Sequence, residues 1–167
     1  AAAVSLVSEG IMDAKEGAGN EMLFDPSEKV SRLEFLVCAM DAFGAGNIPS
    51  SSDAGFADTD TIPEKHRGYV SAAKSLGIVS GVNEGGRMYF RGDEEITYAQ
   101  AAVILNRIIG LESDGTKSLS ADVPEWAYRD VCALTENGIL DPYCNVSASV
   151  DRAGCAQIVC EAVRFFD

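Results

Sequence analysis

Three stretches of the chain place polar or basic side chains at the expected first turn of a helix. Arg32 follows Ser31, Arg152 follows Asp151, and Thr97 stands at the corresponding point of a third stretch. A helix N-terminus presents free backbone N–H groups and a positive partial charge. Arginine adds a planar, two-pronged donor that matches a carboxylate. This combination of residues could bind an anionic ligand.

The same stretches also carry the sequence signature of helix capping. Ser31 with Glu34, and Thr97 with Gln100, form capping boxes, in which each side chain bonds the backbone amide of the other residue. Asp151 can cap the third helix, but no Glu or Gln stands three residues later. These residues are therefore expected to cap helices, whether or not they also contact a ligand.

Other candidate residues have two interpretations each. Arg32 and Arg152 either contact a ligand or are solvated residues of a first helical turn. Trp126 either packs in the core or offers its flat ring and N–H edge to a sugar. Gly81 lies in a glycine-rich turn, where the backbone could approach a ligand closely. The residue types alone leave these alternatives open.

The candidates lie within a pattern that recurs three times, which is typical of a repeat protein. A Gly-Ile pair marks each turn region, beginning at Gly10, Gly77 and Gly138. A mostly apolar helix signal follows each pair, beginning at Val30, Ile96 and Val150. Residues 2–9 and the segments from Pro63 to Gly77 and from Pro124 to Gly138 are predicted as further helices. A hairpin is predicted over 82–90, and the shorter third turn region is expected to lack one.

The helices after the turn regions are apolar around most of their circumference, so they must be buried on most sides. One small repeat could not cover such a helix alone. We therefore predict a mainly α fold, with three helical repeats packed as a pseudo-threefold trimer around a central three-helix core, with short hairpin or turn segments. The repeats span residues 1–46, 55–110 and 117–167 and form one compact unit. The first is expected to be truncated at its N-terminus.

Charge and motif content narrow the classes of function. The net charge of −13 argues against nucleic acid as a partner, because phosphate binding needs a basic surface. No apolar run is long enough to span a membrane, so no membrane insertion is expected. No nucleophile motif, phosphate-binding loop or metal-binding helix pattern is present. We expect no catalytic residues, no cofactor and no metal.

The five cysteines have two interpretations. An odd number cannot pair completely within one chain, and free cysteine behaves as a small buried hydrophobe. The alternative is a zinc or disulfide site among Cys132, Cys144, Cys155 and Cys160. The absence of a Cys-x-x-Cys pair argues against zinc.

The repeated motifs resemble those of the S-layer homology family. The second repeat carries Phe56-Ala57-Asp58, the Gly-Ile-Val-Ser-Gly turn ending at Gly81, Phe90, and Ile-Thr-Tyr-Ala-Gln ending at Gln100. The first repeat carries Val-Ser-Arg-Leu-Glu around Arg32. The third carries Trp126, Gly138-Ile139 and Val-Asp-Arg-Ala ending at Ala153. The resemblance spans nearly the whole chain.

The resemblance implies a non-catalytic anchor outside the cell, on a bacterial cell wall or S-layer. Family members typically occur as triplets within larger surface proteins and bind secondary cell-wall polysaccharide, often through a pyruvylated sugar. It also implies ligand contacts in grooves between neighbouring repeats. The residues that it assigns to these grooves are Arg32, Ser31, Glu34, Thr97, Gln100, Gly81, Trp126, Arg152 and Asp151.

Departures from the family pattern favour an alternative. Tyr98 stands where the motif arginine would be, and Gly154 replaces the motif glutamate. At most two grooves are therefore expected to bind, with Arg32 as the strongest anchor. The alternative is a structural or protein-interaction module whose sugar sites have decayed. A glycosidase would need two carboxylates about 5–10 Å apart across a cleft, and no motif in the sequence designates such a pair.

Overall fold

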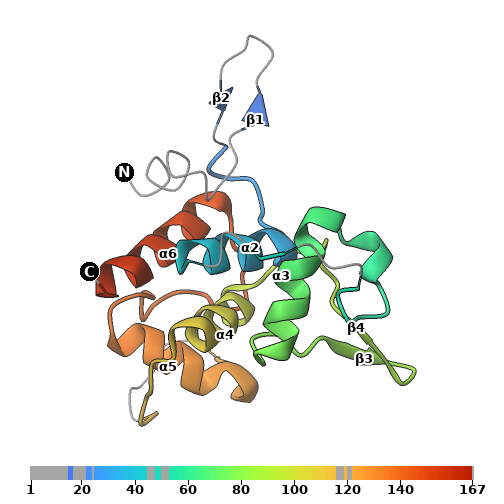
Figure 1. Cartoon of the computed structure of the whole chain (residues 1–167). Coiled ribbons are helices and arrows are strands. Elements are labelled where there is room, and N and C mark those ends of the chain that lie inside the picture. Colours follow the sequence, from blue (N-terminus) through green and yellow to red (C-terminus); the bar gives the residue numbers. More distant parts are fainter. Residues whose placement is uncertain are drawn as a thin grey trace.

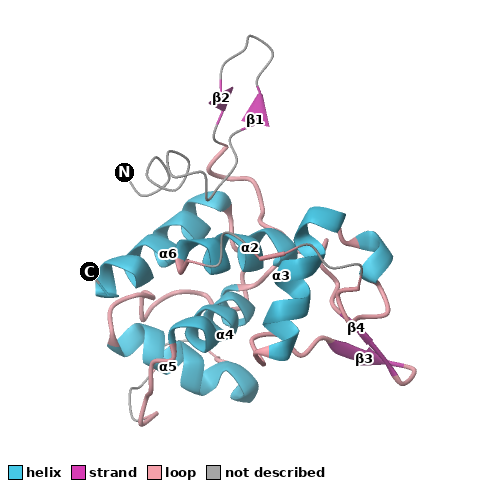
Figure 2. Ribbon diagram, in the orientation of Figure 1, coloured by secondary structure: helices cyan, strands magenta, loops and turns pink. Residues whose placement is uncertain are grey.

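The structure, a computed structural model, describes residues 15–16, 22–23, 25–44, 48–49, 53–115, 119 and 122–166. This part of the chain is mainly helical, as predicted, with short antiparallel hairpins (Figures 1 and 2). The helices are α2 (Arg32–Ala42), α3 (Glu64–Ser75), α4 (Tyr98–Ile109), α5 (Tyr128–Glu136) and α6 (Arg152–Phe166), with 3₁₀ turns η1 (Thr59–Thr61) and η2 (Glu125–Ala127). The strands are β1 (Lys15–Glu16), β2 (Met22–Leu23), β3 (Val82–Glu84) and β4 (Arg87–Tyr89). The predicted helix over 2–9 and its Gly10 end lie outside the described residues.

Side-chain caps begin α2, α4 and α6. The Glu34 amide donates to Ser31 Oγ at 3.2 Å, and the Ser31 amide donates to Glu34 Oε2 at 2.8 Å. Thr97 and Gln100 form the same reciprocal pair, at 3.3 and 3.0 Å. Asp151 accepts a single bond through Oδ1, at 2.8 Å from the amide three residues later. Both predicted capping boxes and the one-sided third cap are therefore confirmed.

Backbone hydrogen bonds join the residues just before these three helices in a ring. The Val30 amide donates to the Val150 carbonyl at 3.0 Å, and the Ile96 amide donates to the Val30 carbonyl at 3.1 Å. The Val150 amide closes the ring on the Ile96 carbonyl at 2.8 Å. Because these bonds connect segments far apart in the sequence, they fix the starts of α2, α4 and α6 against one another.

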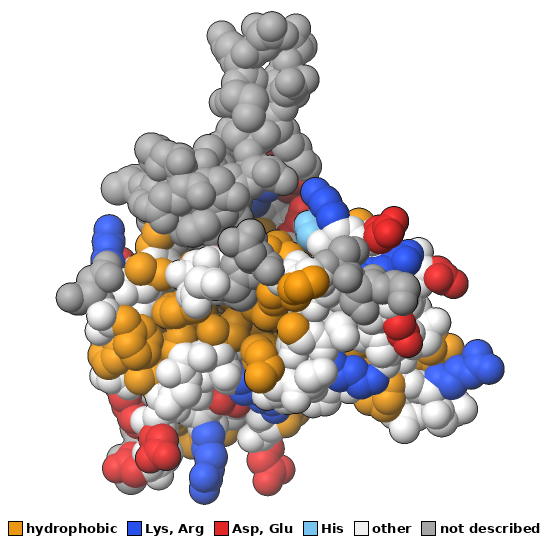
Figure 3. All heavy atoms as spheres, in the orientation of Figure 1, with side chains coloured by type: hydrophobic (Ala, Val, Ile, Leu, Met, Phe, Trp, Pro, Cys, Tyr) orange, Lys and Arg blue, Asp and Glu red, His pale blue; other side chains and the backbone are white. Residues whose placement is uncertain are grey.

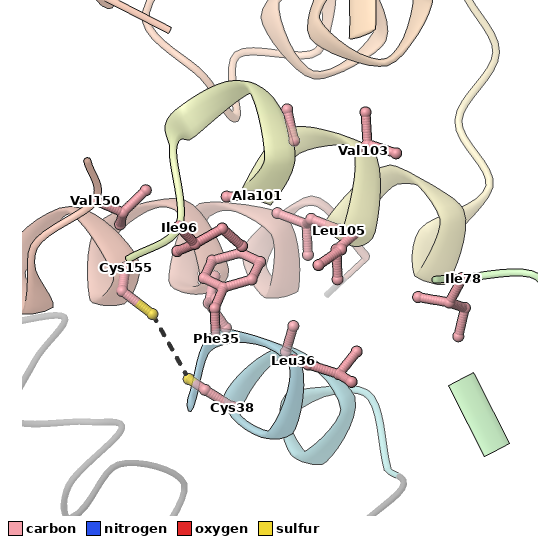
Figure 4. Close-up of a cluster of buried hydrophobic side chains, with 14 of the residues drawn as sticks. Phe35, Leu36, Cys38, Ile78, Ile96, Ala101, Val103, Leu105, Val150 and Cys155 are labelled. Atoms are coloured by element: carbon pink, nitrogen blue, oxygen red, sulfur yellow. Dashed lines mark hydrogen bonds between the residues drawn. The ribbon is translucent and has the colours of Figure 1, made fainter. Parts of the chain in front are cut away.

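The helices that follow this ring supply the hydrophobic core. Phe35 and Leu36 of α2 are fully buried, and they lie among Ala101 and Leu105 of α4 and Cys155 of α6 (Figure 4). Helix α2 packs against both α4 and α6. Helix α4 also packs against α5 and η2, and α3 packs against α2. The predicted burial of these apolar helices is confirmed.

The connections between core helices differ between the second and third turn regions. Strands β3 and β4 form the predicted hairpin, which the Asp58 carboxylate fixes by accepting from the Phe90 and Arg91 amides at 2.8 and 2.7 Å. No strand occurs over residues 141–149, all of which are described, as predicted for the shorter third turn region. The predicted helix from Pro124 is partly wrong, because Trp126 lies on the 3₁₀ turn η2 and α5 begins only at Tyr128.

The five cysteines all lie in the described part of the chain, and none of them forms a disulfide. Cys144 is half-buried and the others are buried, and the Cys155 thiol contacts the Cys38 thiol at a sulfur–sulfur distance of 4.0 Å (Figure 4). The hydrogen bond with Cys38, followed by burial, raises the pKa of the Cys155 thiol well above its ordinary value. Within the described ranges, no group of three or more His, Cys, Asp or Glu side chains could hold a metal ion. The proposed zinc cluster therefore does not form there.

One face of the molecule carries exposed hydrophobic side chains. Figure 3 shows them gathered near the middle of this face, with charged side chains along its edges. Phe165 and Phe166 at the end of α6 are exposed, and Phe166 contacts the ring of Phe43 edge-on. Among the described helices, none is both long enough and apolar enough to cross a membrane.

Candidate ligand-binding grooves

A first groove, here called the Arg32 groove, brings together parts of α2, α4, η2 and the turn after α3. Its volume is about 140 Å³. Four of the residues singled out in the sequence line it, although they come from distant segments: Arg32, Gly81, Gln100 and Trp126. The other lining residues are Ile78, Val79, Ser80, Val103, Ile104 and Arg107.

The Arg32 side chain is held in a fixed position at this groove. Its guanidinium carbon lies 5.4 Å from the centroid of the Phe90 ring, a cation–π geometry. Burial lowers the pKa of the Arg32 guanidinium, and the Glu94 carboxylate acts in the opposite direction. The Nε atom is buried without a hydrogen-bond partner. Leaving a buried charged donor unpaired is unfavourable, so an acceptor placed at Nε would be stabilised.

A second arginine that the sequence analysis did not single out also lines the groove. Arg107 Nη1 donates to the carbonyl oxygens of Gly77 and Ile78, at 3.3 and 3.2 Å. These bonds tie the end of α4 to the turn after α3. The charge of Arg107 contributes to the lowered pKa of Arg32, so the two guanidinium groups repel each other electrostatically. Two neighbouring cations favour an anion between or beside them.

The spacing on α4 could have identified Arg107. It stands seven residues after Gln100, and residues seven apart lie on nearly the same face of a helix. A groove that contains Gln100 therefore extends along α4 towards Arg107. The motif that contains Gln100 covers only the first turn of the helix, so it does not include Arg107.

Gly81 stands at a position where the backbone and its neighbours require glycine. Its φ of 72° lies in the left-handed region that favours glycine. A Cβ at this position would lie 2.5 Å from the Phe56 ring and 2.8 Å from the Tyr89 carbonyl oxygen. The missing side chain therefore makes room for Phe56 and the hairpin. Gly81 still lines the groove through its backbone.

Trp126 is an exposed side chain, because 59% of its surface remains accessible. It is the residue of η2 that lines the Arg32 groove. The interpretation of Trp126 as a buried packing anchor is therefore wrong. Its ring is available as a flat apolar surface beside the two arginines.

The remaining candidates lie outside the Arg32 groove. Ser31, Glu34 and Thr97 form the capping boxes described above. Asp151 caps α6, and Arg152 is buried, with 7% of its surface accessible. The interpretation of Arg152 as a solvated first-turn residue is therefore wrong.

A second groove, here called the Tyr98 groove, lies between the start of α4 and the turn after α5. Its volume is about 330 Å³. Its lining residues are Tyr98, Ile139, Leu140, Asp141, Tyr143, Cys144, Asn145, Ala148, Gly154, Gln157 and Ile158. Tyr98 and Gly154 stand one and three residues after the caps Thr97 and Asp151, as Arg32 and Gln100 stand one and three residues after the caps Ser31 and Thr97 in the first groove.

The two departures from the motif are in contact in this groove. A Cβ at Gly154 would collide with the Tyr98 hydroxyl oxygen and would lie 3.0 Å from Tyr98 Cζ. Tyr98 therefore occupies the space that a side chain at position 154 would need. Burial, and then the Asp151 carboxylate, raise the pKa of the Tyr98 hydroxyl above its ordinary value, so this group is neutral at physiological pH.

Comparison with known proteins identifies one segment of the chain. No curated protein matches the sequence. The family model described as S-layer homology domain matches residues 55–102. That segment supplies Gly81 and Gln100 to the Arg32 groove. An S-layer homology domain is a non-catalytic anchoring module, and it implies attachment of a surface protein to a bacterial cell wall. Over residues 55–102 the chain is thus similar to an S-layer homology domain.

Proposed function

We propose that this protein anchors a larger surface protein to the bacterial cell wall by binding an acidic secondary cell-wall polysaccharide in the Arg32 groove. The group bound would be the carboxylate of a pyruvylated sugar. The observation that carries this proposal is the buried, unpaired Nε of Arg32, in a groove that a second arginine also lines.

The chemistry of the groove suits such a ligand. Arg32 supplies an unpaired donor to a carboxylate oxygen, and Arg107 adds positive charge while its own side chain is fixed by two backbone carbonyls. Trp126 offers an exposed ring to the apolar face of the sugar. The small volume favours a compact group such as a carboxylate with its adjoining ring edge. The net charge of −13 repels anions in general, so this local pair is needed to bind one.

We further propose that the chain consists of three such repeats, over 1–46, 55–110 and 117–167, in a pseudo-threefold arrangement. The ring of hydrogen bonds among Val30, Ile96 and Val150 supports this proposal. A second cyclic set lies two residues later, where the amides of Arg32, Tyr98 and Arg152 donate to the carbonyl oxygens of Glu94, Ala148 and Glu28 at 2.8, 3.0 and 2.9 Å. In this second set each helix start donates to the segment before the next of the three helices, whereas the bonds among Val30, Ile96 and Val150 run in the opposite direction. Both sets close a cycle over the same three segments.

The second candidate function is a structural or protein-interaction module. The replacement of the motif arginine by Tyr98 favours it, because the Tyr98 groove has lost the cation found at the corresponding position in the first groove. Under this hypothesis Arg32 would serve only to pack against Phe90.

Co-sedimentation with purified cell walls separates the two functions. Walls with and without their secondary polymer would be mixed with the wild type and with Arg32→Gln, which removes the charge but keeps a long side chain. We expect wild-type binding that requires the polymer, and a loss of affinity of about tenfold or more in the variant, as for a charge-assisted hydrogen bond.

The matched control is Arg87→Gln, which removes an exposed arginine on the hairpin outside the Arg32 groove. Its affinity should equal that of the wild type. Thermal unfolding of all three proteins checks that they are folded. Equal binding of wild type and Arg32→Gln, or no binding to either wall, would reject the anchoring proposal in favour of the interaction module.

A further inference from the structure

We propose that the Tyr98 groove is a second binding site, which takes an uncharged sugar unit of the same polymer instead of its pyruvylated unit. This inference rests on the proposed function, since it assumes that the protein binds a wall polysaccharide. It differs from the decayed-site hypothesis because it assigns a ligand to the groove that lacks the arginine.

The first argument is that the groove is a formed cavity. Its volume of about 330 Å³ lies at the lower end of the range of small-molecule sites, roughly 300–1,000 Å³. The Arg32 groove, at about 140 Å³, falls below that range. The loss of the arginine has therefore not been accompanied by closure of the site. The glycine at 154 leaves room for Tyr98 to lie against α6.

The second argument is the chemistry of the lining. Asp141, Asn145 and Gln157 are exposed polar residues that line one groove. A sugar hydroxyl both donates and accepts, so it pairs well with carboxylate and amide groups. Among the described residues that line this groove there is no Lys, Arg or His. The carboxylate of Asp141 and the neighbouring charge of Asp151 disfavour an anionic ligand.

Two of these polar side chains are held in place by the turn that carries them. Asp141 Oδ1 accepts from the Tyr143 amide at 2.7 Å, and Asn145 Oδ1 accepts from the Ser147 amide at 3.2 Å. Each bond uses one oxygen and fixes the orientation of the side chain. A site with fixed polar groups loses less conformational entropy on binding than one with mobile groups.

The third argument is the apolar and aromatic surface beside the polar groups. Tyr143 is 82% exposed at this groove, and the Tyr98 ring is half-buried in its wall. Aromatic rings pack against the C–H faces of sugars, while a tyrosine hydroxyl can hydrogen-bond at the edge. Ile139, Leu140 and Ile158 complete an apolar floor. The mixture of aromatic rings, amides and one carboxylate fits a neutral sugar.

The test uses the whole chain and two forms of one probe. The probe is purified secondary wall polysaccharide, either intact or after mild acid treatment that removes its ketal-linked pyruvate. Affinities would be measured by isothermal titration calorimetry for the wild type, for Gln157→Ala and for Arg32→Gln. The matched control on α6 is Arg164→Ala, an exposed residue outside the groove.

We expect the wild type to retain binding to the depyruvylated polymer. Gln157→Ala should weaken this binding about three- to tenfold, as for one lost hydrogen bond, and Arg164→Ala should not change it. Gln157 is exposed on a helix, so its replacement by alanine should leave the fold intact. A second variant, Tyr98→Phe, keeps the ring against Gly154 and removes only the hydroxyl. It should weaken binding of the depyruvylated polymer as well.

The results distinguish this inference from the proposed function. Absence of wild-type binding to the depyruvylated polymer would overturn the inference, and so would unchanged affinity in both Gln157→Ala and Tyr98→Phe. Neither result affects the role of Arg32. The proposed function fails instead if Arg32→Gln binds the intact polymer as tightly as the wild type.

Discussion

The Arg32 groove and the Tyr98 groove are built on the same local plan but have opposite chemistry. In each, the residue after a helix cap faces the first turn of the next core helix. In the first groove these positions hold Arg32 and Gln100, and the groove is small and cationic. In the second they hold Tyr98 and Gly154, and the groove is larger and has no basic residue among its described lining.

The two substitutions that distinguish the Tyr98 groove depend on each other. Tyr98 and Gly154 each depart from the family pattern, and separately they suggest loss of function. In the structure they are a matched pair, because the tyrosine fills the space where a Cβ at 154 would lie. The second groove is therefore a different site of its own, rather than an incomplete copy of the first.

The largest expected effect comes from the core that both grooves share. Phe35 on α2 is fully buried among side chains of α4 and α6, the helices that contribute residues to the two grooves. Phe35→Ala should lower the free energy of unfolding by about 3–5 kcal/mol. Since α2 packs on both α4 and α6, we expect both binding activities to be lost together. Urea denaturation measures the stability, and survival of binding at one groove alone would contradict a shared core.

The next effect is a difference in stability between two variants, each of which places a glutamate in one of the grooves. Gly154→Glu places a glutamate in the Tyr98 groove, but its Cβ collides with Tyr98. We expect a loss of about 1–3 kcal/mol, as for other overpacked sites. Gln100→Glu makes the corresponding change in the Arg32 groove, where the capping bond to the Thr97 amide is retained. It should leave stability nearly unchanged, and thermal unfolding compares the two.

A double substitution sharpens this result. Tyr98→Arg with Gly154→Glu replaces the pair by an arginine and a glutamate, the residue types of the Arg32 site after Gln100→Glu, so it should recover most of the stability lost by Gly154→Glu alone. Residues in contact commonly show coupling energies of about 0.5–3 kcal/mol when the two single substitutions are compared with the double substitution. Additive effects of the two substitutions would mean that Tyr98 and Gly154 are independent, contrary to their contact.

Local patterns in the sequence predicted the elements that local physics determines. The capping boxes at Ser31 and Thr97 were confirmed, because a cap needs only two residues three apart. The hairpin around Gly85 was confirmed, because its turn residues are adjacent in the chain. The burial of α2, α4 and α6 followed from their apolar composition, which left no polar face wide enough for solvent.

Contacts between distant segments could not be predicted in the same way. Arg107 donates to the carbonyl oxygens of Gly77 and Ile78, which lie 30 and 29 residues earlier in the chain. No pattern of neighbouring residues predicts hydrogen bonds over such a separation. The contact of Tyr98 with Gly154 joins two helices and needs the packed core to form. Gly81 was recognised as a special position, but the space beside it belongs to Phe56, which only the tertiary structure reveals.

A smaller effect separates the grooves by their response to salt. Binding through Arg32 and Arg107 is electrostatic, so raising NaCl from about 0.05 M to 0.5 M should weaken binding of the intact polymer several-fold by screening. Binding of the depyruvylated polymer in the Tyr98 groove should change little. Titration calorimetry at the two salt concentrations measures both affinities. Equal salt dependence for the two polymers would mean that both bind at a charged site.

The smallest effect is a dependence of stability on alkaline pH that originates at the Tyr98 groove. Folding raises the pKa of the Tyr98 hydroxyl through burial, and the pKa of the half-buried Cys144 thiol for the same main reason. A group with a raised folded pKa stabilises the fold fully below its unfolded pKa, and this contribution is lost as pH rises above that value. The loss should begin near pH 8.5 for the thiol and near pH 10 for the tyrosine, the approximate values of the unfolded groups.

Tyr98→Phe tests this assignment, because it keeps the ring over Gly154 but removes the ionisable hydroxyl. Its free energy of unfolding should fall less steeply than that of the wild type above about pH 10, and the two curves should run parallel below that pH. Urea denaturation between about pH 7 and pH 11 measures the difference. If the wild-type and Tyr98→Phe curves ran parallel over the whole range, the Tyr98 hydroxyl would titrate as it does in the unfolded chain, and the second groove would be more open to water than its contacts with α6 imply.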